Sequence, residues 1–99
     1  MIARNRSRPK LPYVVVYNHE IVRYGADAAI LLAELRFLSD THKKDNHGYF
    51  AVEKKHLRTM LGFSRNKVLK TREKLRKLGK IDYIQGSNQN AKTRYKIVL

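Results

Sequence analysis

The stretch "LGFSRNKVLKTREKLRKLGKIDYIQG" (residues 61–86) decides the fold that the sequence predicts. Gly62 and Gly79 enclose a segment in which most polar positions are cationic, and Ser64 stands where the first N–H groups of a helix need a side-chain acceptor. Apolar or small side chains recur every three or four residues, at Val68, Thr71, Leu75 and Leu78. The stretch therefore predicts a helix over 64–78 with one buried face, ending in a left-handed conformation at Gly79.

Two alternating segments follow this helix. In "KIDYIQ" (80–85) and "RYKIVL" (94–99) apolar and polar side chains alternate, which is typical of strands with one buried face. The segment between them, "GSNQNAKT" (86–93), is rich in turn-forming residues. We expect an antiparallel hairpin with a polar, basic tip.

The residues before the basic helix predict a scaffold. "YVVVY" (13–17) favours a short strand or extended segment, and Asn18 is a candidate cap for a brief helical turn over 19–25. Asp27 is a candidate cap for a helix over 28–38 that is apolar nearly all round. We expect one face of that helix to pack in the core and another, together with residues 13–17, to meet a second copy of the chain.

A polar loop over 39–48 leads to a short strand over 49–52. A further helix is expected from about Glu53, with Leu57, Met60 and Leu61 in a buried stripe and Gly62 as its left-handed end. The loop contains four side chains that could bind zinc or nickel: Asp40, His42, Asp45 and His47. Because its histidines lack helical i, i+4 spacing and a fixed scaffold, we interpret it as a loop and expect no metal and no cofactor.

The charge of the chain is strongly segregated. Residues 1–12 carry a net charge of +4, residues 13–52 carry −1 and residues 53–99 carry +11, which together make the formal total of +14. Clustered like charge repels itself unless a polyanion neutralises it. The two ends of the chain are therefore predicted to bind nucleic acid, and the middle to act as scaffold.

The amino-acid composition excludes several classes of protein. With 99 residues and 42% hydrophobic residues, one small packed domain is expected, and no apolar run reaches the length of a transmembrane helix. Without cysteine there is neither a disulfide framework nor a thiolate metal site, which favours a reducing cytoplasm. The N-terminal residues lack the apolar region of a secretory signal. No nucleophile motif is present and no small-molecule site is evident, so we do not expect an enzyme.

The predicted order of elements resembles a winged helix-turn-helix domain over residues 25–98. The resemblance lies in "HLRTMLGFSRNKVLKTREKLRKLGKI" (56–81), with its pattern "LG.S...V...R..L..LG.I". Within this family the chain is most similar to the DNA-binding domains of phage replisome organisers, plasmid replication initiators or small repressors. The resemblance implies an α+β fold, a three-helix core and a C-terminal β-hairpin wing. The basic composition of residues 1–12 predicts an arm that precedes a domain over 13–99. The resemblance also implies a prokaryotic, viral or plasmid-encoded context.

The expected partner is double-stranded DNA, bound by a homodimer. The candidates for base readout are Arg65, Asn66, Lys67 and Lys70, with Arg65 and Asn66 preferred, since Arg and Lys can donate to guanine and Asn can pair with adenine in the major groove. The other candidate contacts on the basic helix are Ser64, Thr71 and Lys74. In the hairpin they are Asn88, Gln89, Asn90, Lys92 and Arg94, and in the arm Arg4, Arg6 and Arg8, suited to phosphate or minor-groove contact.

Two alternatives remain open at this point. The same basic face could bind RNA or single strands, with the tyrosines stacking on bases, although most tyrosines fall in predicted strands where packing is the commoner role. The chain could instead be an adaptor that contacts a replication or transcription protein. Tighter binding to duplex than to single strands of equal length would argue against the first alternative. Binding to a protein partner that survives charge reversal at Lys67 and Lys70 would favour the second.

Overall fold

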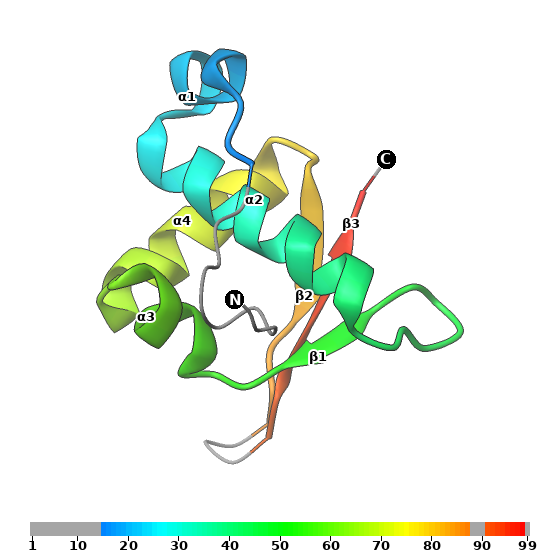
Figure 1. Cartoon of the computed structure of the whole chain (residues 1–99). Helices are drawn as coiled ribbons and strands as arrows, with labels where there is room; N and C mark the ends of the chain where they lie inside the picture. The colour runs from blue at the N-terminus through cyan, green and yellow to red at the C-terminus, as the bar shows by residue number, and fades with distance from the viewer. Residues whose placement is uncertain (1–14, 88–90, 99) are drawn as a thin grey trace, which may run out of the picture.

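The computed structural model describes residues 15–87 and 91–98, and from residue 18 onward its elements follow the predicted order (Figure 1). The described residues form α1 (Asn18–Tyr24), α2 (Ala26–Thr41), β1 (Phe50–Val52), α3 (His56–Leu61), α4 (Arg65–Lys77), β2 (Ile81–Ile84) and β3 (Thr93–Ile97). Four helices and a three-stranded antiparallel sheet make this part of the chain an α+β fold. The predicted basic helix, the strand before α3 and the C-terminal hairpin are all present.

The sheet has the order β1-β3-β2, so β3 lies between the other two strands. Tyr95 of β3 pairs with Phe50 on one side and with Tyr83 on the other, which places three aromatic rings in one row. Helix α2 packs on β3 and α4 packs on β2. The core lies between these helices and the sheet, and its fully buried side chains include Leu31, Leu32, Leu35, Phe50, Leu57, Leu75 and Ile81.

Helix α4 has the ends that the sequence predicts. The side chain of Ser64 accepts a hydrogen bond of 3.1 Å from the N–H of Lys67, which satisfies one of the first-turn donors. At the other end the N–H of Lys80 donates to the carbonyl of Leu75 and the N–H of Gly79 to that of Arg76, both at 3.0 Å. Gly79 has a φ of 76°, so the helix ends in a Schellman motif.

Two of the predictions for helix starts are wrong, and one prediction for the scaffold is met in its second form. Residues 15–17 form no strand, but Tyr17, directly before α1, has the extended conformation that was the alternative for this segment; residues 13 and 14 lie outside the described residues. Neither Asn18 nor Asp27 caps a helix, because α1 and α2 begin one or two residues earlier than expected, after Tyr17 and Gly25, with no side-chain cap. Helix α3 begins at His56 rather than at about Glu53, since residues 53–55 form the turn between β1 and α3.

Two residues of the predicted buried stripes lie at the surface. Met60 is 41% exposed and Leu78 is 44% exposed, whereas Leu57, Val68 and Leu75 are buried as expected. Helix α3 is short, and Leu78 is the C-cap of α4, so both exposed residues lie at or near a helix end where the apolar face turns away from the core. Spacing alone did not reveal where each helix leaves the core.

Helix α2 is covered by its own chain on nearly all sides. It contacts α1, α3, α4 and β3, and between residues 28 and 38 only Ile30, Arg36 and Phe37 are not buried. The surface that we expected to meet a second copy is therefore not available, and the homodimer itself stays a prediction. The side chains of Val15 and Tyr17, from the apolar segment before α1, are exposed. No helix in the described part of the chain has the length and apolar character needed to span a bilayer.

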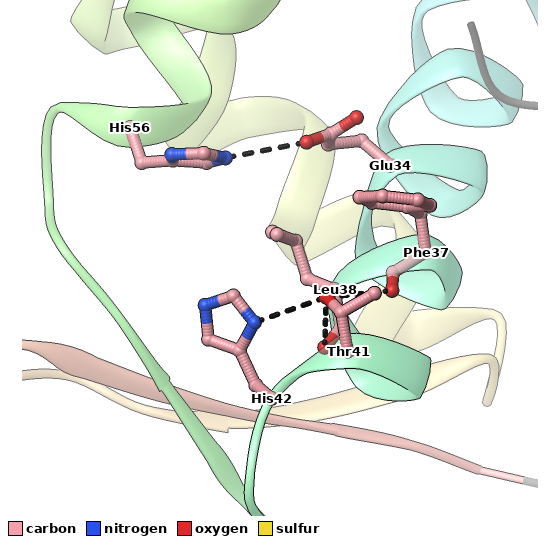
Figure 2. A network of polar contacts seen from close by, with 6 residues as sticks. All are labelled: Glu34, Phe37, Leu38, Thr41, His42 and His56. Carbon is pink, nitrogen blue, oxygen red and sulfur yellow. Dashed lines mark hydrogen bonds and ion pairs between the residues drawn. The ribbon is translucent and has the colours of Figure 1, made fainter. Parts of the chain in front are cut away.

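Polar contacts on α2 fix the helices around it. Arg36 donates two hydrogen bonds to the buried carboxylate of Glu20, at 2.7 and 2.8 Å, and so holds α1 on α2. On the α3 side of the helix, Nε2 of His56 lies 3.2 Å from a carboxylate oxygen of Glu34, which is also buried (Figure 2). His56 thus lies at the edge of the core, and this contact positions the first turn of α3.

Candidate nucleic-acid interface

Helix α4 presents its cations between two hollows. Its inward face is formed by Val68, Thr71 and Leu75, together with Arg72, whose burial the sequence did not indicate. The remaining positions are largely exposed and carry most of its basic side chains. The helix therefore forms a cationic ridge, and the surfaces on its two sides determine what it can bind.

The first hollow, here the hairpin hollow, lies between α3, α4 and the base of the β2–β3 hairpin. Its volume is about 820 Å³. Six basic side chains line it, against the single acid Glu53: Lys54, Lys55, Arg58, Arg65, Arg72 and Lys92. Val68, Leu69 and Tyr95 add apolar surface to the lining. This hollow has the size and charge to accept an extended polyanion.

The second hollow, here the α2 hollow, lies on the other side of α4, against the start of α2. Its volume is about 520 Å³. Lys67, Lys70 and Lys74 line it together with Ser64 and Asn66, and among the described residues Asp27 is its only acid. Nζ of Lys67 lies 3.6 Å from the Asp27 carboxylate and 5.0 Å from the ring centre of Phe63. Two successive exposed turns of α4 therefore face this hollow with ammonium groups.

The predicted contact residues divide between these surfaces. Arg65 and Lys92 lie in the hairpin hollow, whereas Ser64, Asn66, Lys67, Lys70 and Lys74 lie in the α2 hollow. Thr71 also lines the α2 hollow but is only 7% exposed and belongs to the inward face of α4, so its contact with phosphate stays a prediction. Asn88, Gln89, Asn90, Arg4, Arg6 and Arg8 lie outside the described residues.

Arg94 points away from both hollows. It occupies β3 next to the inward-facing Tyr95, so its side chain leaves the opposite face of the sheet. There its Nη1 lies 3.7 Å from the carboxylate of Asp45. Arg94 is half exposed, and its contact with DNA stays a prediction.

Sequence reasoning missed part of the site. Lys54, Lys55 and Arg58 come from the turn before α3 and from α3 itself, and they reach the hairpin hollow because β1 brings this turn beside the base of the hairpin. Nζ of Lys54 donates to the carbonyl of Gly86 at 3.4 Å. The run of bases over 54–58 was a visible signal, but its position depends on the pairing of β1 with β3, which the sequence did not indicate.

Two of the three acids of the basic half, Glu73 and Asp82, are held by hydrogen bonds from tyrosines. Glu73 accepts a hydrogen bond of 2.7 Å from the hydroxyl of Tyr83, and this bond lowers the pKa of Glu73. Asp82 accepts one of 2.6 Å from the hydroxyl of Tyr49, which likewise holds its pKa below the ordinary value. These carboxylates stay ionised and do not neutralise the hollows. Within the described residues, no carboxylate lies within 4 Å of Lys55, Arg58, Arg65, Lys70, Lys74 or Lys92.

The loop after α2 is arranged by its own hydrogen bonds. Asp45 accepts from the N–H groups of His47 and Tyr49, at 2.8 and 3.0 Å, and these two bonds lower its pKa. Nδ1 of His42 lies 3.2 Å from the hydroxyl of Thr41, which also donates to the carbonyl of Phe37 (Figure 2). In the described part of the chain, no three side chains of His, Asp or Glu are grouped as metal ligands.

No protein-family model, no curated protein and no solved structure matches the chain. Its function is therefore inferred from the placement and the charge of its own residues.

Proposed function

We propose that the chain is a winged helix-turn-helix protein that binds double-stranded DNA with α4 in the major groove. The observation that carries this proposal is the position of α4 as an exposed ridge between two cationic hollows. In this reading α2, α3 and α4 are the three-helix core, α3 and α4 are the helix-turn-helix, and the β2–β3 hairpin is the wing.

Duplex DNA has the shape that this ridge requires. Its major groove is about 12 Å wide, and an α-helix with its side chains is about 10–12 Å across. A phosphate strand borders the groove on each side, so a helix in the groove meets anions on both of its flanks. The hairpin hollow and the α2 hollow supply cations on those two flanks, and each accepts one strand.

Base readout is assigned to the first turn of α4. Arg65 and Asn66 are exposed there, and they have the donors and acceptors for guanine and adenine edges respectively. Lys67 lines the α2 hollow, and there we assign it to phosphate contact, which the nearby Asp27 carboxylate weakens. Lys70 and Lys74, one and two turns further on, follow the phosphate strand in the α2 hollow.

The tyrosines give little support to the binding of single-stranded nucleic acid. A stacking platform needs exposed aromatic faces, but Tyr24 and Tyr95 are buried. The hydroxyls of Tyr49 and Tyr83 donate to Asp82 and Glu73, so these rings take part in the packing of the sheet and of α4. Duplex DNA, which is recognised without stacking on aromatic rings, fits the described surface better.

Fluorescence anisotropy tests the proposal with duplex DNA, single-stranded DNA and duplex RNA of equal length. We expect tightest binding to duplex DNA and an affinity that falls steeply with salt, because phosphate contacts release counterions. Tighter binding to single strands or RNA would favour the first alternative. Weak binding to all three, at any salt concentration, would favour the protein adaptor. Sites selected from random duplexes would then decide between a transcription regulator and a replication accessory, since helix-turn-helix folds serve both.

A further inference from the structure

Arg72 connects α4 to both strands of the hairpin. Its Nη1 donates to the hydroxyl of Tyr95 on β3 at 3.1 Å, and its Nη2 donates to Oε1 of Gln85, directly after β2. The guanidinium also lies over the ring of Tyr83, 4.5 Å from its centre. One side chain thus spans the joint between the helix that we assign to base readout and the hairpin that we assign to the wing.

The charge of Arg72 has no carboxylate counter-ion in the described part of the chain. The residue is only 6% exposed, its described hydrogen-bond acceptors are neutral oxygens, and its Nε is buried without a partner. Burial disfavours the charged form of Tyr95 and raises its pKa, so that hydroxyl stays neutral as well. An apolar side chain of similar volume would fill such a place without the cost of desolvating a cation. Packing alone therefore does not explain why a charged side chain occupies this buried position.

The hollow that Arg72 lines supplies that reason. Arg72 contributes to the lining of the hairpin hollow, where we place one phosphate strand. A phosphate there would provide the missing negative charge next to a guanidinium that already holds the hairpin. The helix, the hairpin and the phosphate strand would then share one cation.

The two strands of the hairpin lie very close together at its base, next to the contact with Arg72. The strands approach so closely at Gly86 that a Cβ there would lie 2.4 Å from the carbonyl oxygen of Ala91. Lys54 also donates to the carbonyl of Gly86, from the other side of the hollow. The two strands are therefore closely joined where the Arg72–Gln85 contact attaches them to α4.

We propose that Arg72 is a positioning residue that fixes the angle between α4 and the hairpin, and thereby the spacing between their contacts on DNA. The proposal rests on the proposed function for its DNA part. Its structural part, the attachment of the hairpin to α4, holds for the free protein and is tested separately.

The test uses Arg72→Lys with Arg76→Lys as a matched control. Arg76 lies one turn further along α4, is at the same 4.5 Å from the ring centre of Tyr83, and pairs with Glu73, but makes no contact with Gln85 or Tyr95. Both changes conserve charge, and a lysine at 72 cannot donate to two separate acceptors in the fork geometry of arginine. Gln85→Ala removes the hydrogen-bond acceptor of Arg72 instead of its donor. Gln85 is exposed, so this substitution leaves the core intact.

The first readout is amide hydrogen exchange of the free protein at residues 84–87 and 91–94. We expect about tenfold faster exchange there in Arg72→Lys and in Gln85→Ala, and no change in Arg76→Lys. The second readout is hydroxyl-radical footprinting on a preferred duplex. The first two variants should lose protection on the hairpin side and retain it under α4, while Arg76→Lys keeps the whole footprint.

The outcomes separate the two proposals. Exchange and footprints that match those of Arg76→Lys in both other variants would overturn the role of Arg72. If Arg72→Lys fails to fold, Gln85→Ala decides by the same readouts. A wild-type protein that protects no duplex would overturn the proposed function and the DNA part of this inference, while the exchange data would still report whether Arg72 holds the hairpin.

Discussion

The carboxylate of Asp27 lies 3.6 Å from Nζ of Lys67, so the first turn of α2 places an acid against the first exposed turn of α4. Both side chains are about half exposed, and in the described part of the chain Asp27 is the only acid that lines the α2 hollow. Such an exposed pair adds little to stability. Its larger effect is to oppose a phosphate that approaches Lys67.

We therefore predict that Asp27→Asn strengthens binding to every duplex, whatever its sequence, by roughly threefold to tenfold at low salt. Asp40→Asn is the matched control, because it changes the net charge equally at the far end of α2, outside both hollows. Anisotropy titrations on a preferred and a random duplex measure the effect. Equal gains from both variants would show that only net charge matters.

A carboxylate placed beside Arg72 should raise the stability of the protein and lower its affinity for DNA. In Gln85→Glu a carboxylate replaces the neutral acceptor of Arg72, which should raise the free energy of unfolding by about 1 kcal/mol. The same change should weaken duplex binding, because the hairpin hollow loses positive charge where we place a phosphate strand. Urea unfolding and anisotropy test the two effects, with Gln85→Ala for comparison. Stability and affinity that rise together would contradict this account.

The turn between α3 and α4 depends on a left-handed residue. Gly62 has a φ of 69°, and a Cβ at this position would meet nothing within 4 Å, so only the backbone conformation penalises a side chain. Gly62→Ala should destabilise the protein by about 1 kcal/mol and lower the Tm by about 5 °C. Gly62→Asn should lose less, because asparagine tolerates this conformation better. Thermal unfolding measures both variants, and equal losses would show that the conformation is not the cause.

The contact between Glu20 and Arg36 makes part of the stability depend on pH. The hydrogen bond from Arg36 is the main cause that lowers the pKa of the Glu20 carboxyl, so the contact stabilises the fold above about pH 4.5 and is lost as the pH falls through the lowered pKa. Arg36 is 37% exposed and solvent screens the pair, so Glu20→Gln should lose only about 1 kcal/mol at neutral pH. That deficit should shrink in acid.

Urea unfolding at about pH 7 and about pH 3 measures the deficit. Glu53→Gln is the control, because Glu53 is exposed and has no ion pair within the described residues. A deficit in Glu20→Gln that is the same at both pH values would show that the ion pair is not its source.

The features that the sequence predicted well depend on neighbouring residues. Ser64 caps α4 through an N–H three residues away, and Gly79 ends it through carbonyls three and four residues back along the chain. The hairpin likewise follows from alternation and a turn-rich segment. Capping and turn chemistry act over a few residues, so their signals are readable in a short stretch.

The features that the sequence did not predict depend on distant contacts. Arg72 looked like one more surface cation on α4, yet residues 13 and 23 positions away hold it in the interior. Helix α1 covers part of α2, and the Glu20–Arg36 pair that joins them links residues 16 positions apart. No periodicity within one helix carries such information, so both the joint at the hairpin and the absence of a free α2 face became evident only in the fold.

The most direct test of the central claim is a salt series of duplex binding for Arg65→Ala and Lys70→Ala beside the wild type. If α4 lies in the major groove, Lys70→Ala should weaken binding to all duplexes and lower the salt slope by about 1. Arg65→Ala should weaken binding to the preferred site by about 1–3 kcal/mol and leave random duplexes nearly unchanged. Unchanged affinity and slope in both variants would show that α4 is not the helix that reads DNA.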